Sequence, residues 1–259
     1  MEKLLTERKD RESASLRMHK HALTQMSHRY LKQWLDTPIP EFFQLQTAAA
    51  ILQTAGREEE EIELVTTVLL LIYHGLSTHE NIDDQPTANQ KSRQLKVLAG
   101  DYYSSKYFYL LAANGKIGLI GRFAQAIARI NEAKAERIQL LPPNHSNIET
   151  YLALHERIDG ELLYVLCAEY MQDEAVLSDI VRMLVYVQVL GLQYNQTKSM
   201  PLQVRNGISG LLYDRLKSGL AAVRSLLSSQ SELVYDKFMA VCNYLDQLYC
   251  SQTIAVKGE

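Results

Sequence analysis

Residues 64–84 read LVTTVLLLIYHGLSTHENIDD, an apolar stretch that runs into an acidic end. Between 64 and 72, apolar side chains cover nearly every side of the predicted helix, whereas a surface helix carries them along one stripe. The acidic run at 58–61 suits the positive end of a helix dipole. We therefore expect a helix over 58–80 in the middle of a helical bundle, with any chemistry at its C-terminal end.

The rest of the chain repeats the helical pattern between breaks at proline. All six prolines fall where the apolar periodicity stops, because proline is excluded from helix interiors. No segment alternates apolar and polar residues between turns, so we expect no β-sheet. The sequence predicts an all-α, single-domain bundle of about nine to ten helices over 1–259, with frayed ends at 1–11 and 252–259. Helices are expected at 12–35, 41–55, 58–80, 92–113, 116–140, 147–171, 173–197, 202–227 and 230–251.

Composition excludes several classes of function. The formal net charge is −3 with both signs interspersed, so no broad basic field is available for nucleic acid. The three cysteines lack metal-type spacing and are odd in number for disulfides, which predicts reduced thiols. Residues 1–30 lack a secretory signal, and the most apolar run, 64–76, is too short to cross a bilayer. We expect a cytoplasmic protein without an integral membrane segment or a nucleic-acid partner.

Two motifs follow one another at the acidic end of the buried helix. Residues 79–84 read HENIDD, and residues 98–103, on the next helix, read LAGDYY. In order and spacing they resemble the trans-prenyl diphosphate synthases, in which a His-Asp-Asp-x-x-Asp helix end precedes an Ala-Gly-Asp signature. The run 94–112, QLKVLAGDYYSSKYFYLLA, is similar to component I, the small non-catalytic subunit of heterodimeric bacterial heptaprenyl or hexaprenyl diphosphate synthases. The resemblance covers roughly residues 40–200 and implies an isoprenoid synthase-like bundle.

The resemblance places Glu80, Asn81 and Asp84 where the family has the aspartates of its first motif. In the family, two carboxylate clusters on facing helices hold the Mg²⁺ ions that neutralise the diphosphate leaving group. An amide at 81 and a longer side chain at 80 weaken such a site, because Mg²⁺ demands near-ideal octahedral oxygen geometry. His74 and His79 lie near these acids, but a histidine on such a helix is more often a hydrogen-bonded structural residue.

The second aspartate-rich motif has lost its acids. Gly191, Leu192 and Asn195 stand at the aspartate positions, so no carboxylate remains there. The Gly-Lys-x-Arg-Pro and Arg-Arg-Gly elements of the family are also absent. We therefore expect no catalytic residue, metal or cofactor in this chain, which should be inactive alone, with Mg²⁺ bound by a catalytic partner.

Aromatic residues crowd the helix expected at 92–113 on more than one side. They cannot all enter one core, and tyrosine is favoured where an apolar surface meets a polar rim in an interface. The resemblance implies that this helix and the next form the subunit interface. The candidate partner contacts are therefore Tyr103, Tyr107, Leu110 and Leu111.

The leading interpretation is a component I subunit that pairs, as a heterodimer, with an aspartate-rich catalytic large subunit. The resemblance implies that the pair condenses isopentenyl diphosphate onto farnesyl diphosphate for the menaquinone side chain, with this chain setting activity and chain length. Two alternatives stay open. Glu80, Asp83 and Asp84 could support a weak Mg²⁺-dependent terpenoid synthase, or the chain could be a homodimeric module that binds isoprenoids or proteins. A homodimer could also form when the chain is alone.

Overall fold

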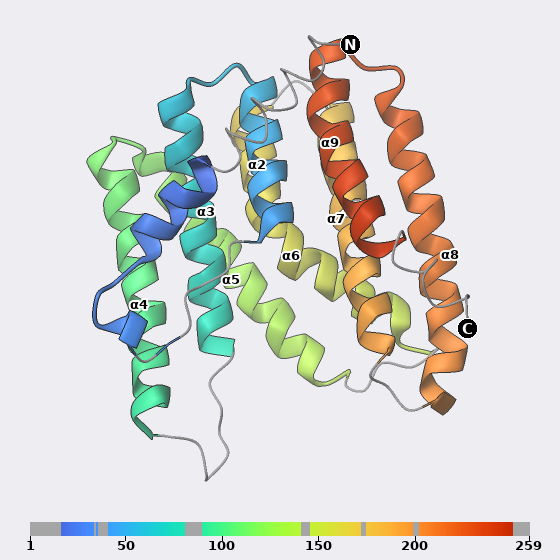
Figure 1. The fold of residues 1–259 in the computed structure, drawn as a ribbon, viewed down its shortest axis with the longest axis horizontal. Coiled ribbons are helices and arrows are strands. Elements are labelled where there is room, and N and C mark those ends of the chain that lie inside the picture. Colours follow the sequence, from blue (N-terminus) through green and yellow to red (C-terminus); the bar gives the residue numbers. More distant parts are fainter. Residues whose placement is uncertain are drawn as a thin grey trace. The chain divides into compact units, whose positions relative to one another are not determined.

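The computed structural model describes residues 17–33, 35, 41–80, 90–140, 146–171, 175–198 and 202–250. Within these ranges every regular element is a helix and there is no strand, which confirms the all-α prediction (Figure 1). The frayed ends expected at 1–11 and 252–259 lie outside the described residues. The elements after the first short helix are η1 (Leu31–Gln33), α2 (Phe42–Thr54), α3 (Glu59–Glu80), α4 (Gln90–Ala113), α5 (Ile117–Ile138), α6 (Ile148–Tyr170), α7 (Ala175–Thr197), α8 (Leu202–Leu227) and α9 (Glu232–Tyr249).

The first helix is shorter than the sequence predicts. Residues 17–26 are helical, but the chain then turns and forms the 3-10 helix η1, so the continuous helix expected over 12–35 is wrong in its second half. The His28 ring lies 5.2 Å from the Tyr102 ring, and Leu31 is buried. These tertiary contacts form where the turn redirects the chain, and no proline or glycine marks the turn in the sequence.

The chain divides into two compact units. Unit 1 comprises residues 1–49 and 57–120, and unit 2 comprises residues 50–56 and 121–259. That the whole chain behaves as a single domain stays a prediction.

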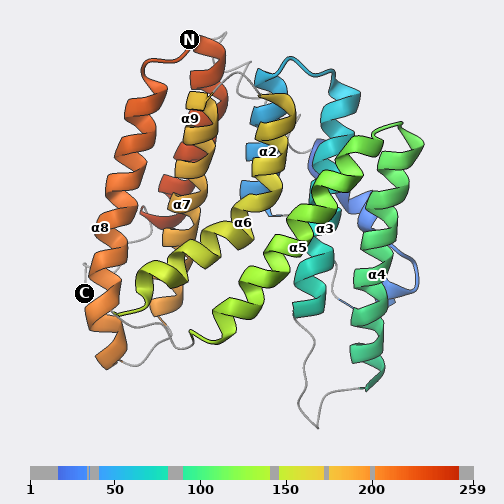
Figure 2. The ribbon, with the colours of Figure 1, turned by 180° about the vertical axis from the view of Figure 1, so that it is seen from behind.

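In unit 1, α3 packs along α4 (Figures 1 and 2). Three glutamates fill the first turn of α3, and apolar side chains are then buried on almost every side of the helix, as the sequence predicts. On α4 the buried side chains recur every four residues, so each lies next to the following one in a stripe that winds around the helix. They are Leu95, Ala99, Tyr103, Tyr107 and Leu111.

In unit 2, α7 is the central helix and packs against α6, α8 and α9. Gly219 of α8 lets that helix approach closely, because a Cβ there would lie 2.8 Å from Val187 Cγ2. Both α3 and α7 are long and apolar enough to cross a membrane, but 61% and 56% of their apolar windows are buried inside the fold. Burial of this extent is typical of the core helices of a soluble protein.

Candidate functional site

The end of α3 carries the first degenerate motif. Glu80 is the last residue of the helix and is exposed, whereas Asn81 and Asp84 lie outside the described residues. The His79 ring covers Gly100 of α4, where a Cβ would lie 2.5 Å from His79 Cε1. Its Nε2 lies 3.8 Å from Asp101 Oδ1. The structure therefore brings His79, the first residue of one motif, against Gly100 and Asp101 of the other.

His74, one and a half turns earlier on α3, is buried, and its Nε2 has no hydrogen-bond partner among the described residues. Burial lowers the pKa of this imidazole from its ordinary value of 6.5 to about 4, so the ring is neutral at pH 7. Its ring meets Tyr73 edge-on, with centroids 5.8 Å apart. Within the described ranges, no three His, Cys, Asp or Glu side chains gather closely enough to hold a metal ion.

The second degenerate motif lies on α7, in unit 2. Gly191 is buried, and a Cβ added there would lie 2.5 Å from Tyr249 Cγ of α9. Leu192 and Asn195 are half-buried, and Asn195 Oδ1 accepts a hydrogen bond of 2.8 Å from Lys198 Nζ. In phosphate sites Mg²⁺ is held by one or two protein carboxylates together with waters and phosphate oxygens, which need open space around the carboxylates. The residues at this position offer no carboxylate, and at Gly191 they offer no space, so they do not fit the metal.

The residues that the sequence suggests for a partner interface occupy two environments on α4. Tyr103, Tyr107 and Leu111 are buried within unit 1, with exposures of 4%, 8% and 0%, and Leu110 is half-buried. The large apolar side chains that α4 exposes most are different ones. They are Leu98 at 58%, Phe108 at 53% and Tyr109 at 65%. A partner role for the four suggested residues stays a prediction.

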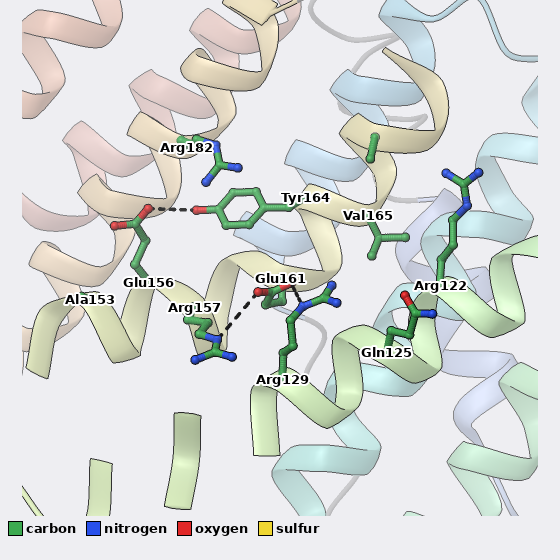
Figure 3. Close-up of a pocket in the computed structure, with 11 residues that line it drawn as sticks. Arg122, Gln125, Arg129, Ala153, Glu156, Arg157, Glu161, Tyr164, Val165 and Arg182 are labelled. Atoms are coloured by element: carbon green, nitrogen blue, oxygen red, sulfur yellow. Dashed lines mark hydrogen bonds and ion pairs between the residues drawn. The ribbon is translucent and has the colours of Figure 1, made fainter. Parts of the chain in front are cut away.

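A hollow of about 640 Å³ lies in unit 2 between α5, α6 and α7, and no sequence motif predicts it (Figure 3). We call it the arginine-lined hollow, because four arginines from the three helices surround it. The arginines are Arg122 and Arg129 on α5, Arg157 on α6 and Arg182 on α7. The sequence contains a weak signal for it, since positions 122 and 129 are seven residues apart and therefore share one face of a helix.

Carboxylates of the same chain neutralise most of the positive charge around the arginine-lined hollow. Arg129 Nε donates to Glu161 Oε2 at 2.9 Å, and Arg157 Nη2 donates to Glu132 Oε2 at 3.3 Å. Arg122 pairs with Glu169 at 2.6 Å. These internal pairs mean that most of the positive charge is already compensated, which disfavours an open anion site.

Tyr164 and Arg182 form the remaining side of the hollow (Figure 3). The Tyr164 hydroxyl donates to Glu156 Oε1 at 3.2 Å, and the Arg182 guanidinium lies 4.5 Å above the tyrosine ring. Burial, and then the charge of Glu156, raise the pKa of Tyr164 far above its usual range, so the phenol stays protonated. The described residues that line the hollow are thus hydrogen-bonded or charge-paired, and none of them is an activated nucleophile.

Comparisons with known proteins give one consistent result. Residues 28–206 match the family model described as heptaprenyl diphosphate synthase subunit 1. Over 113 residues the chain is 35% identical to heptaprenyl diphosphate synthase component 1 of Geobacillus stearothermophilus, a stretch that spans 44% of this chain and half the length of that relative.

Solved structures show a similar fold at low sequence identity. A decaprenyl diphosphate synthase from Rhodobacter capsulatus matches with a TM-score of 0.63 and 13% identity, covering 94% of this chain and 97% of that one. A geranylgeranyl pyrophosphate synthase from Lactobacillus brevis matches with a TM-score of 0.65 and 12% identity, covering 95% and 99%. These neighbours confirm the isoprenoid synthase-like bundle, and the family match confirms the resemblance drawn from the two motifs. The chain belongs to the family of heptaprenyl diphosphate synthase subunit 1.

Proposed function

We propose that the chain is the non-catalytic subunit of a two-part heptaprenyl diphosphate synthase and acts in a heterodimer with a catalytic large subunit. The observation that carries this proposal is on α7, where residues 188–198 contain no carboxylate. Without a carboxylate in this stretch, the second motif has no cluster to hold a diphosphate through metal ions. Mg²⁺ would be bound by the partner, and prenyl transfer would take place there.

The exposed apolar surface of α4 supports pairing through this helix. Leu98, Phe108 and Tyr109 present large apolar side chains to solvent, and Ile117 at the start of α5 is 61% exposed. Exposed aromatic side chains of this kind are typical of the anchors of protein interfaces. We infer that these side chains, with the half-buried Leu110, contact the large subunit.

In the heterodimer, this chain would set activity and product length without ionising a substrate. Apolar side chains from its helices would help to close the partner's elongation tunnel, and chain growth stops where a bulky residue blocks the pocket. The product would be the long-chain prenyl diphosphate of the menaquinone side chain, made in the cytoplasm.

The test is a mixing experiment with the purified chain and the purified large subunit. Prenyl transfer from farnesyl diphosphate and isopentenyl diphosphate is measured for each alone and for the mixture. We expect no transfer by this chain alone, and transfer with long-chain product when the two are mixed. Transfer by the isolated chain, abolished by Asp84→Ala, would instead support a weak terpenoid synthase and contradict the proposal.

A further inference from the structure

Tyr249, the last residue of α9, places its ring directly over Gly191 in the C-terminal third of α7. The tyrosine is 2% exposed, and a Cβ at residue 191 would lie 2.5 Å from its Cγ atom. Real Cβ contacts are essentially never shorter than 3.0 Å. The tyrosine ring can therefore occupy this place only because residue 191 is a glycine.

The hydroxyl end of Tyr249 is fixed as well. It donates a buried hydrogen bond of 3.0 Å to Gln188 Oε1, one turn before Gly191 on the same helix. Gln188 is only 6% exposed. Breaking this bond would leave two buried polar groups to be satisfied again, which costs on the order of 1–3 kcal/mol for each group.

The ring cannot make room by a simple rotation. Cγ is bonded to the tyrosine Cβ, so rotation about χ2 leaves it in place, and rotation about χ1 breaks the bond to Gln188. Moving Cγ by another route requires a shift of the α9 backbone, which packs against α7. The Tyr249 side chain is thus fixed at its hydroxyl by Gln188 and at its Cβ by the α9 backbone.

We propose that Tyr249 is a built-in plug that fills the place beside residue 191 where a metal-binding side chain would have to lie. The proposal rests on the proposed function, because it takes residue 191 as the position of an acid in catalytic relatives. An aspartate restored there would have its Cβ directed into the tyrosine ring instead of into water or toward a cation. The heterodimer accordingly contains one metal clamp, that of the large subunit.

Thermal unfolding of the full chain tests the plug with a matched pair of glycines. A Cβ added at Gly210, on α8, would meet nothing within 4 Å, so Gly210→Ala should keep or raise the melting temperature. Gly191→Ala should lower it by several degrees despite the same gain in helix propensity. Equal melting temperatures for Gly191→Ala and wild type would overturn the proposal.

A double variant separates the plug from general damage to α7. Tyr249→Ala alone should lower the melting temperature, because it leaves a cavity. In Tyr249→Ala with Gly191→Ala, the second substitution should cause no further loss, since the ring that it meets is gone. Additive losses in the double variant would show that residue 191 is intolerant for another reason, and would contradict the plug.

The metal consequence is tested by titrating the isolated chain with Mg²⁺ and inorganic pyrophosphate. Gly191→Asp should bind no more pyrophosphate than wild type does. If Gly191→Asp fails to fold while Gly210→Asp folds, the larger side chain clashes with the tyrosine ring, which also supports the plug. Mg²⁺-dependent pyrophosphate binding by Gly191→Asp would overturn the plug. None of these measurements uses the large subunit, so a failure of pairing would leave their outcome unchanged.

Discussion

Glu161 lies between two arginines on the wall of the arginine-lined hollow. Its side chain is 14% exposed, and it accepts a hydrogen bond from Arg129 while lying 3.9 Å from Arg157. Glu132 also pairs with Arg157, but its side chain is 63% exposed. Water screens an exposed ion pair far more than a partly buried one, so the two glutamates should differ in what they contribute.

We therefore expect Glu161→Gln to destabilise the chain by about 1–2 kcal/mol, because two partly buried guanidinium groups lose their shared counterion. Glu132→Gln is the control and should cost less than about 0.5 kcal/mol. Urea unfolding of both variants at low salt measures the difference. Equal effects of the two substitutions would show that the stability of the chain does not depend on the burial of Glu161.

His74 gives the fold a dependence on pH whose sign can be worked out. Its pKa is lowered in the folded chain to about 4, against 6.5 ordinarily, so the unfolded chain binds more protons between these values. Above pH 6.5 the ring is neutral in both the folded and the unfolded chain, so its burial does not oppose folding. As the pH falls from 6.5 toward 4, the unfolded chain takes up a proton that the folded chain does not, and the free energy of unfolding decreases.

The free energy of unfolding should fall by about 2 kcal/mol between pH 7 and pH 5 through His74 alone. In His74→Leu this part of the pH dependence should vanish, because leucine does not titrate and leaves no imidazole nitrogen unpaired. Denaturant unfolding at the two pH values, for wild type and variant, gives the comparison. The same pH slope in both proteins would contradict a buried neutral histidine.

At the scale of elements, the long helices are well predicted from the sequence, whereas the break in the first helix is not. The helices expected at 41–55 and 230–251 are observed as Phe42–Thr54 and Glu232–Tyr249. Prolines and apolar periodicity mark such boundaries locally. The break after residue 26 depends on contacts with distant residues, and local patterns contain no information about those.

The orientation of α4 follows from a spacing that is present in its sequence. Its buried side chains are four residues apart, whereas the interface prediction for Tyr103 and Tyr107 rests on the crowding of aromatic residues. A repeat of four places successive side chains next to one another in a continuous stripe along the helix, and α4 packs along α3. Tyr103 and Tyr107 belong to the buried face, while Phe108 and Tyr109 are exposed to solvent.

The two faces of α4 should respond differently to substitution. Phe108→Glu should leave the stability of the isolated chain within about 0.5 kcal/mol of wild type, since the side chain is exposed. It should weaken binding to the large subunit at least tenfold, because a charge replaces an apolar anchor. Calorimetric titration and thermal unfolding measure the two effects.

Tyr103→Ala is the counterpart on the buried face and should cost about 3 kcal/mol of stability in the isolated chain. If Phe108→Glu binds the large subunit as tightly as wild type does, the exposed face of α4 is not the contact surface. A Tyr103→Ala chain as stable as wild type would in turn contradict the burial of that ring.

At the scale of the whole molecule, two short motifs were enough to predict the family. They were not enough to predict which side chain lies beside residue 191 in the second motif. A missing acid at 191–195 is visible in the sequence, and it indicates a weakened metal site. The residue that occupies the place is Tyr249, which meets Gln188 across 61 residues of chain. Such a contact is decided by how α9 docks on α7, and helix periodicity does not specify it.

The stability of the whole chain should depend on its partner. A protein that binds only the folded state raises the free energy of unfolding by RT ln(1 + [L]/Kd), or about 2.7 kcal/mol at a hundredfold excess over Kd. The melting temperature of this chain should therefore rise with the concentration of the large subunit, whereas Mg²⁺ and pyrophosphate alone should not change it. Phe108→Glu, which exchanges an exposed side chain, should reduce the rise, to about half if the binding is tenfold weaker. A melting temperature that rises with Mg²⁺ and pyrophosphate in the absence of the large subunit would place a metal clamp in this chain after all.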